Sequence, residues 1–128
     1  MKTLTIKEPW ASLIIEEHKK YEFRTWKTKY RGKILIHAGQ SYESKYSHLT
    51  EHYNLELSKG EIIGEATIID CILVDKEFSE ELKKTNPLVY HDNYENIYAW
   101  KLTNVVKYDK PIKVKGKLGL WNYQGGEN

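Results

Sequence analysis

The sequence predicts a single α+β domain built as a small mixed β-barrel, not as a doubly wound sheet. Two observations support this fold class. Segments with the pattern of strands are separated by irregular helical insertions and not by regularly spaced helices. A chain of 128 residues is long enough for one hydrophobic core and too short for a second. No linker, internal repeat or low-complexity tract divides the chain, so residues 1–128 are expected to form one domain.

Hydrophobic periodicity predicts the elements in order. Pro9 suits the first turn of a helix over 9–18, in which Trp10, Leu13 and Ile14 recur at helical spacing. A long strand over 61–75 follows a second helix, and Gly64 is expected to form a bend or bulge in it. The other expected elements are strands at 3–6, 22–24, 33–38, 97–106 and 111–114, helices at 42–54 and 79–84, a loop at 116–121 and a frayed tail at 124–128.

Composition narrows the class of protein. No apolar run approaches the roughly 18–20 residues that a membrane-spanning helix needs, and the amino terminus has no apolar signal-peptide core. The chain has one cysteine, Cys71, which excludes an internal disulfide and is typical of a reducing compartment. We therefore expect a cytoplasmic protein with no membrane partner.

Positive charge is concentrated in two segments, 19–33 and 101–117. Together they hold 13 of the 20 basic and two of the 18 acidic residues, so their net charge is +11 against −9 for the rest of the chain. Such segregation predicts one continuous positive surface that binds a polyanion. The alternative is two solvated strand edges, where lysines deter aggregation. Charge alone leaves both interpretations open.

Several common sites are absent from the sequence. There is no glycine-rich phosphate loop, and no Gly-x-Ser-x-Gly nucleophile elbow. His48 and His52 have a spacing that can bind zinc, but neither a third ligand in a known motif nor paired cysteines accompany them. We therefore predict no metal site and no cofactor.

Three stretches resemble the ASCH family, a branch of the PUA-like β-barrels. They are residues 4–14 (LTIKEPWASLI), residues 19–38 with KKYEFRTW, YRG and IHA, and residues 98–121 with YAW and PIKVKGKLGLW. The second stretch is similar to the family signature GxKxxExR, with Glu17 in place of its glycine. Because glycine commonly ends a helix in a left-handed conformation, we expect the first helix to end by another geometry or to continue towards His18.

The resemblance implies a PUA-like β-barrel with the first helix packed beside a cleft that carries Lys19, Glu22 and Arg24. In the family this cleft is inferred to bind RNA or nucleotides, and some relatives bind DNA or RNA. Other relatives are reported to cleave RNA. One branch hydrolyses acetylated cytidine with a lysine that corresponds to Lys19, but its threonine falls at Glu22 here.

The leading hypothesis is a non-catalytic module that binds RNA or a modified nucleoside or nucleotide. Arg24 would bind a phosphate through its planar fork, Lys19 would add charge, and Glu22 would accept a hydrogen bond from a base. Trp26 would either stack on a base or pack in the core, where Trp10 and Trp100 are expected. The other candidate nucleic-acid contacts are Lys27, Arg31, Lys33, Lys115 and Lys117.

Two alternatives remain open. A small hydrolase acting on a modified nucleoside or on RNA would use Lys19 and Glu22 as its catalytic pair. A protein-interaction domain with no nucleic-acid role would be consistent with the acidic remainder of the chain. The Glu22 and Arg24 pair could also be purely structural.

Overall fold

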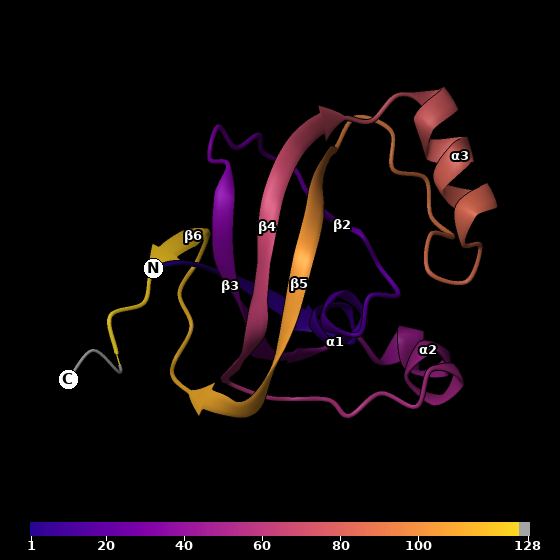
Figure 1. Ribbon diagram of the computed structural model, residues 1–128. Helices are drawn as coiled ribbons and strands as arrows, with labels where there is room; N and C mark the ends of the chain where they lie inside the picture. Colours follow the sequence, from indigo (N-terminus) through magenta and orange to yellow (C-terminus); the bar gives the residue numbers. More distant parts are fainter. Residues whose placement is uncertain (126–128) are drawn as a thin grey trace.

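A computed structural model describes residues 1–125 of the chain (Figure 1). The elements are β1 Lys2–Glu8, α1 Trp10–Ile15, β2 Tyr21–Arg24, β3 Gly32–Tyr42, the 3₁₀ helix η1 Ser44–Tyr46, α2 Ser47–His52, β4 Glu61–Leu73, α3 Lys76–Thr85, β5 Tyr98–Lys113 and β6 Leu120–Asn122. The last three residues of the tail that was expected to fray, 126–128, lie outside the described residues.

The six strands form one mixed sheet in the order β2-β5-β4-β3-β1-β6. β1 runs parallel to β3, and the other neighbouring strands are antiparallel. The α+β class is confirmed, but the predicted barrel is wrong, because β2 and β6 are free edges and the sheet does not close. A side chain and not a backbone ladder spans the opening: the guanidinium of Arg24, on β2, donates to the carbonyl oxygen of Thr5, on β1, at 2.8 Å.

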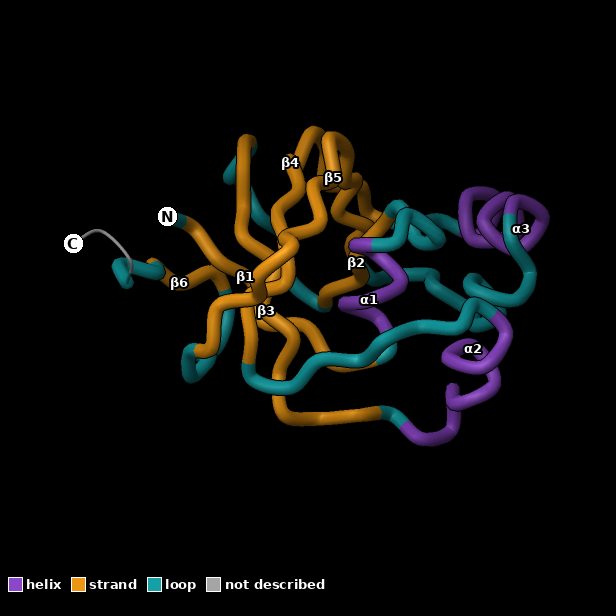
Figure 2. The backbone as a smooth tube through the Cα atoms, turned by 60° about the horizontal axis from the view of Figure 1, so that its bottom comes forward, coloured by secondary structure: helices purple, strands orange, loops and turns teal. Residues whose placement is uncertain are grey.

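Helix α1 lies between two apolar clusters and contributes to both. Ala11, Ile14 and Ile15 pack against the sheet with residues of β1, β3, β4 and β5. Leu13 packs on the other side against residues of α2, α3 and the segment that follows α3. Figure 2 shows α2 and α3 together at one end of the molecule, with α1 between them and the strands. Because all residues from Ala11 to Ile15 are buried, the position of α1 is fixed from both sides.

The largest departures from the sequence prediction concern β5, β3 and β6, while α1 ends three residues earlier and α3 begins three residues earlier than predicted. β5 is one strand and not two, and it continues through Pro111. Proline is tolerated there because β2 pairs with β5 only as far as Lys101, so at Pro111 β5 pairs with β4 on one side and is a free edge on the other. β3 extends to Tyr42, so the second helix begins at Ser47 and not at residue 42. The segment predicted as a loop at 116–121 contains the start of β6, in which Trp121 pairs with Thr3.

The predicted irregularity at Gly64 is confirmed. The pairing of β4 shifts register next to Gly64 on both sides, against β3 and against β5. A Cβ atom at this position would lie 2.3 Å from the carbonyl oxygen of Val106 and 2.8 Å from Cδ1 of Ile15. Glycine therefore lets β5 and α1 approach β4 closely.

The end of α1 corrects a second prediction. Glu17 has φ 64°, the left-handed conformation in which glycine commonly ends a helix. The amide of Glu17 donates to the carbonyl of Ile14 at 3.0 Å and the amide of His18 to that of Leu13 at 2.8 Å, the two hydrogen bonds of a Schellman motif. The helix thus ends as it would with glycine, because these hydrogen bonds fix the backbone despite the glutamate side chain.

Candidate functional site

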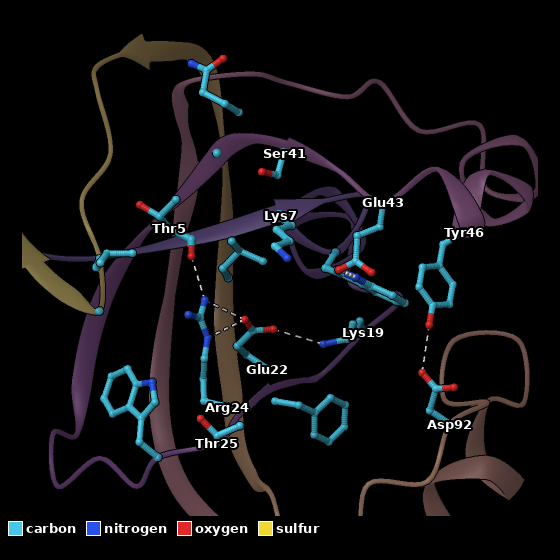
Figure 3. Close-up of a pocket in the computed structure, with 18 of the residues that line it drawn as sticks. Thr5, Lys7, Lys19, Glu22, Arg24, Thr25, Ser41, Glu43, Tyr46 and Asp92 are labelled. Atoms are coloured by element: carbon cyan, nitrogen blue, oxygen red, sulfur yellow. Dashed lines mark hydrogen bonds and ion pairs between the residues drawn. The ribbon is translucent and has the colours of Figure 1, made fainter.

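A cavity of about 630 Å³ opens between β1 and β2, where a closed barrel would have its wall. This volume lies in the range of about 300–1,000 Å³ that is typical of small-molecule sites. Its charged lining residues come from five parts of the chain: Lys7 on β1, Lys19 to Arg24 around β2, Glu43 before η1, Asp92 after α3, and Lys117 in the loop before β6. Figure 3 shows the labelled residues around the cavity.

Lys19, Glu22 and Arg24 form one connected ion network at the centre of the site (Figure 3). Oε1 of Glu22 lies 3.4 Å from Nζ of Lys19, and Oε2 accepts from Nε of Arg24 at 2.9 Å. Nη2 of Arg24 also lies 2.9 Å from Oε2, in addition to its hydrogen bond to Thr5. Within residues 1–125, the Nη1 group of Arg24 has no hydrogen-bond partner. One side of the guanidinium is therefore available to a ligand.

The side chain of Lys19 is buried and makes its hydrogen bonds within the protein. Its side chain is 4% exposed, and Nζ donates to the carbonyl oxygen of Tyr21 and to Glu22. Nζ also lies 4.8 Å from the ring centroid of Phe23 and 5.5 Å from that of Trp10. Burial lowers the pKa of Lys19; Glu22 opposes this shift, and Arg24 adds to it. Lys19 therefore holds Glu22 in place and has little surface to offer a ligand.

Aromatic side chains form the walls of the cavity. Trp26 is 38% exposed, and its ring meets that of Trp100 edge-on at 4.7 Å. Trp100 is fully buried, which confirms its predicted place in the core. Trp10 contacts both apolar clusters as a partly buried residue, and it also lines the cavity. Helical periodicity identified only the first of these two roles.

Two carboxylates in the lining were not anticipated. Oε1 of Glu43 accepts a hydrogen bond from the indole of Trp10 at 3.2 Å. Oδ2 of Asp92 accepts from the hydroxyl of Tyr46 at 3.0 Å, and burial, followed by Asp92, raises the pKa of that hydroxyl. Glu43 falls in a segment predicted to be helical, and Asp92 lies in a loop without any motif. Nothing in the sequence therefore indicated that either residue belongs to the site.

Four of the predicted nucleic-acid contacts lie outside the cavity lining: Lys27, Arg31, Lys33 and Lys115. Arg31 and Lys33 lie within 3.9 Å of Asp70 and 3.3 Å of Glu65, respectively. Lys107 pairs with Glu16 at 2.6 Å. Acids from the remainder of the chain thus neutralise part of the two basic segments. Lys19, Glu22, Arg24, Trp26 and Lys117 do meet around one cavity.

Residues 1–125 contain neither a cluster of metal-ligating side chains nor a helix fit to span a membrane. His48 and His52 lie on or at the end of α2, and residues 1–125 contain no group of three or more His, Cys, Asp or Glu that could hold a metal ion. No helix among these residues is long and apolar enough to cross a membrane.

Comparison with protein families gives one match, to the ASCH domain, over residues 4–112. In curated proteins, the human and mouse proteins named activating signal cointegrator 1 are each 33% identical to the chain over 90 residues. Each alignment covers 61% of this chain but only 15% of the relative. The similarity therefore concerns one small part of each relative.

Comparison with solved structures supports the same fold. The crystal structure of ASCH from Zymomonas mobilis matches with a TM-score of 0.55 and 17% identity, over 88% of this chain and 72% of that chain. A mutant of the same protein matches with a TM-score of 0.54, also at 17% identity, over 88% and 74% of the two chains. At this identity the likeness shows the shared fold alone.

Proposed function

The chain belongs to the ASCH domain family, and on that premise we propose that it is a module that binds single-stranded RNA by holding one nucleotide in the cavity between β1 and β2. The observation that carries the proposal is the arrangement of Arg24. Arg24 lines the cavity, its guanidinium is anchored to Glu22 and Thr5, and its Nη1 group has no hydrogen-bond partner in residues 1–125. An anchored planar fork is suited to a phosphate, because little conformational freedom is lost on binding.

Two further cations add to the positive charge around Arg24. Lys7 extends from β1, and Lys117 belongs to the loop that precedes β6. Both side chains are exposed, so a phosphate can reach them without rearrangement of the core. We assign Arg24 to the phosphate of the bound nucleotide, and Lys7 and Lys117 to the phosphates on either side of it in the strand.

The walls of the cavity supply surfaces for a base. Trp26 is exposed on one side and held by Trp100 on the other, so its ring is presented in a fixed orientation. Stacking of a base on an aromatic side chain contributes about 1–3 kcal/mol. A cavity of about 630 Å³ admits one nucleotide and not an extended strand. The nucleotides on either side of the bound one would therefore lie outside the cavity, along its edge.

The salt dependence of RNA binding tests the proposal. With three phosphate-binding cations, log K for a short single-stranded RNA should fall against log salt with a slope of about −2, since each contact contributes about −0.7. Lys117→Ala should reduce the slope by about 0.7. Lys115→Ala, two residues away and outside the lining, should leave it unchanged. Equal effects of the two variants, or binding indifferent to salt, would exclude this site for the phosphate.

A hydrolase is the second candidate, because the lowered pKa of Lys19 and the size of the cavity suit a reaction on a nucleoside. Both oxygens of Glu22 are engaged by cations, however, which weakens it as a general base. We therefore expect no product when the protein is incubated with acetylated cytidine or short RNA and the mixture is analysed by chromatography. Product that forms with the parent protein and disappears with Glu22→Gln would establish the hydrolase instead.

A further inference from the structure

Resting on the proposed function, we propose that the nucleotide held in the cavity is a guanine nucleotide, and that Glu43 is the residue that selects its base. The starting observation is that the cavity proposed to hold a nucleotide is also lined by the carboxylate of Glu43, which would repel a phosphate. Glu43 must therefore face a part of the ligand that donates hydrogen bonds.

Glu43 is held in place from two sides. Its backbone amide donates to the carbonyl oxygen of Glu8 at 2.8 Å, which ties the residue to the end of β1. Its Oε1 accepts from the indole of Trp10 at 3.2 Å. Within the described part of the chain, Oε2 has no hydrogen-bond partner. Figure 3 shows the carboxylate among the residues that surround the cavity. The side chain thus presents an oriented acceptor to the ligand.

The cavity carries a positive side chain, Arg24, and a negative one, Glu43, on different elements, which suits a ligand with a phosphate at one end and hydrogen-bond donors at the other. Arg24 enters from β2, whereas Glu43 enters from the turn between β3 and η1. Trp10 beside Glu43 packs edge-on against Tyr46 at 4.7 Å and gives this part of the cavity an aromatic wall. A ligand with its phosphate at Arg24 and its base at Trp10 would place an edge of that base against Glu43. Trp26 would then stack on the neighbouring base of the strand.

Only one of the four common bases has an edge that suits a carboxylate. Guanine presents two adjacent donors, the N1–H and the N2 amino group, to the two oxygens of a carboxylate. Adenine and cytosine each place a ring acceptor beside their amino donor, and uracil flanks its single N–H with carbonyl oxygens. Because a bound base would exclude water from Glu43, a polar group left unpaired or repelled there would weaken binding. Glu43 should therefore discriminate in favour of guanine.

Titration of the parent protein with the four ribonucleoside monophosphates, followed by tryptophan fluorescence, tests this inference without any variant. GMP should bind at least tenfold more tightly than AMP, CMP or UMP. IMP, which lacks the N2 amino group, should bind several-fold more weakly than GMP. Equal affinity for GMP and AMP would overturn the inference and leave the proposed function standing. Failure of all nucleotides and of short RNA to bind would overturn both.

Glu43→Gln then tests the residue itself. The amide retains an oxygen for the indole of Trp10 but replaces the other acceptor with a donor. GMP affinity should fall at least tenfold, while AMP affinity should stay level or rise, since an amide pairs well with adenine. Glu51→Gln, an exposed glutamate on α2 outside the lining, is the matched control and should change neither. A variant that melts at the parent temperature and keeps the preference for GMP would refute the role of Glu43.

Discussion

Glu22→Ala is expected to lower the free energy of unfolding by about 3–5 kcal/mol, the cost of leaving a buried charge without its partner. Lys19 is 4% exposed, and Glu22 is the only acidic side chain paired with it in residues 1–125. Without this carboxylate, the buried ammonium group of Lys19 either stays charged beside the rings of Trp10 and Phe23 without a counter-charge, or loses its proton. Urea unfolding measures the effect, provided that the m-value is unchanged.

The double variant Lys19→Met with Glu22→Ala separates an unpaired charge from a simple loss of packing. Methionine fills a similar volume and needs no counter-charge, so the double variant should recover most of the stability lost by Glu22→Ala. A double variant no more stable than Glu22→Ala would show that the ion pair is not what stabilises this part of the fold.

The pH dependence of stability gives a second readout of the same pair. Burial holds the pKa of folded Lys19 below its usual value of 10.5. Between the two values the unfolded chain binds more protons, so the free energy of unfolding should rise with pH in this window. Tyr90, whose pKa is raised to about 12, acts in the opposite direction above pH 10, so measurements belong below pH 10. Lys19→Met should lose the rise.

Arg24→Ala is expected to weaken RNA binding at least thirtyfold, or by about 2 kcal/mol, the lower end of the cost of truncating a hydrogen-bonded charge pair. The change removes both the phosphate ligand and the bridge from β2 to Thr5. Arg24→Lys keeps the charge next to Glu22, so this variant should remain folded. Lysine cannot contact Glu22 and Thr5 together, however, so the variant should bind RNA about tenfold more weakly.

Arg31→Ala is the matched control for Arg24→Ala. Arg31 belongs to the same basic segment, but it lies outside the cavity and near Asp70. Its removal should change RNA affinity less than threefold. If Arg31→Ala weakens binding as much as Arg24→Ala, the RNA follows an extended basic track, and the cavity is not its main site.

Local patterns predicted β1 to β4 and the position of α1, because alternation and helical spacing are properties of neighbouring residues, but they divided β5 in two and missed β6. The α+β class followed from these patterns. These patterns could not predict whether the barrel closes. Closure depends on whether β2 and β1 form backbone hydrogen bonds or are joined only by the side chain of Arg24. The left-handed Glu17 was also missed, since hydrogen bonds from Glu17 and His18 and not the side chain determine its conformation.

The candidate site divides in the same way. The resemblance to a known signature identified Lys19, Glu22 and Arg24, which the fold brings into one network. The basic segments suggested Arg31 and Lys33 as well, but acids distant in sequence pair with both. Glu43 and Asp92 could not be found, since their place in the cavity depends on how α2 and the loop after α3 pack. Such long-range packing has no local pattern.

The indole resonances of the four tryptophans offer the most direct test of a nucleotide in the cavity between β1 and β2. Trp10 and Trp26 line this cavity, Trp100 is buried behind Trp26, and Trp121 lies on β6 outside the lining. In a ¹⁵N NMR titration with short RNA, assigned with Trp→Phe variants, the indole signals of Trp10 and Trp26 should shift most, and that of Trp121, which donates to Thr5 in the lining, should shift less. RNA that binds and leaves the signals of Trp10 and Trp26 unmoved would contradict the proposed site.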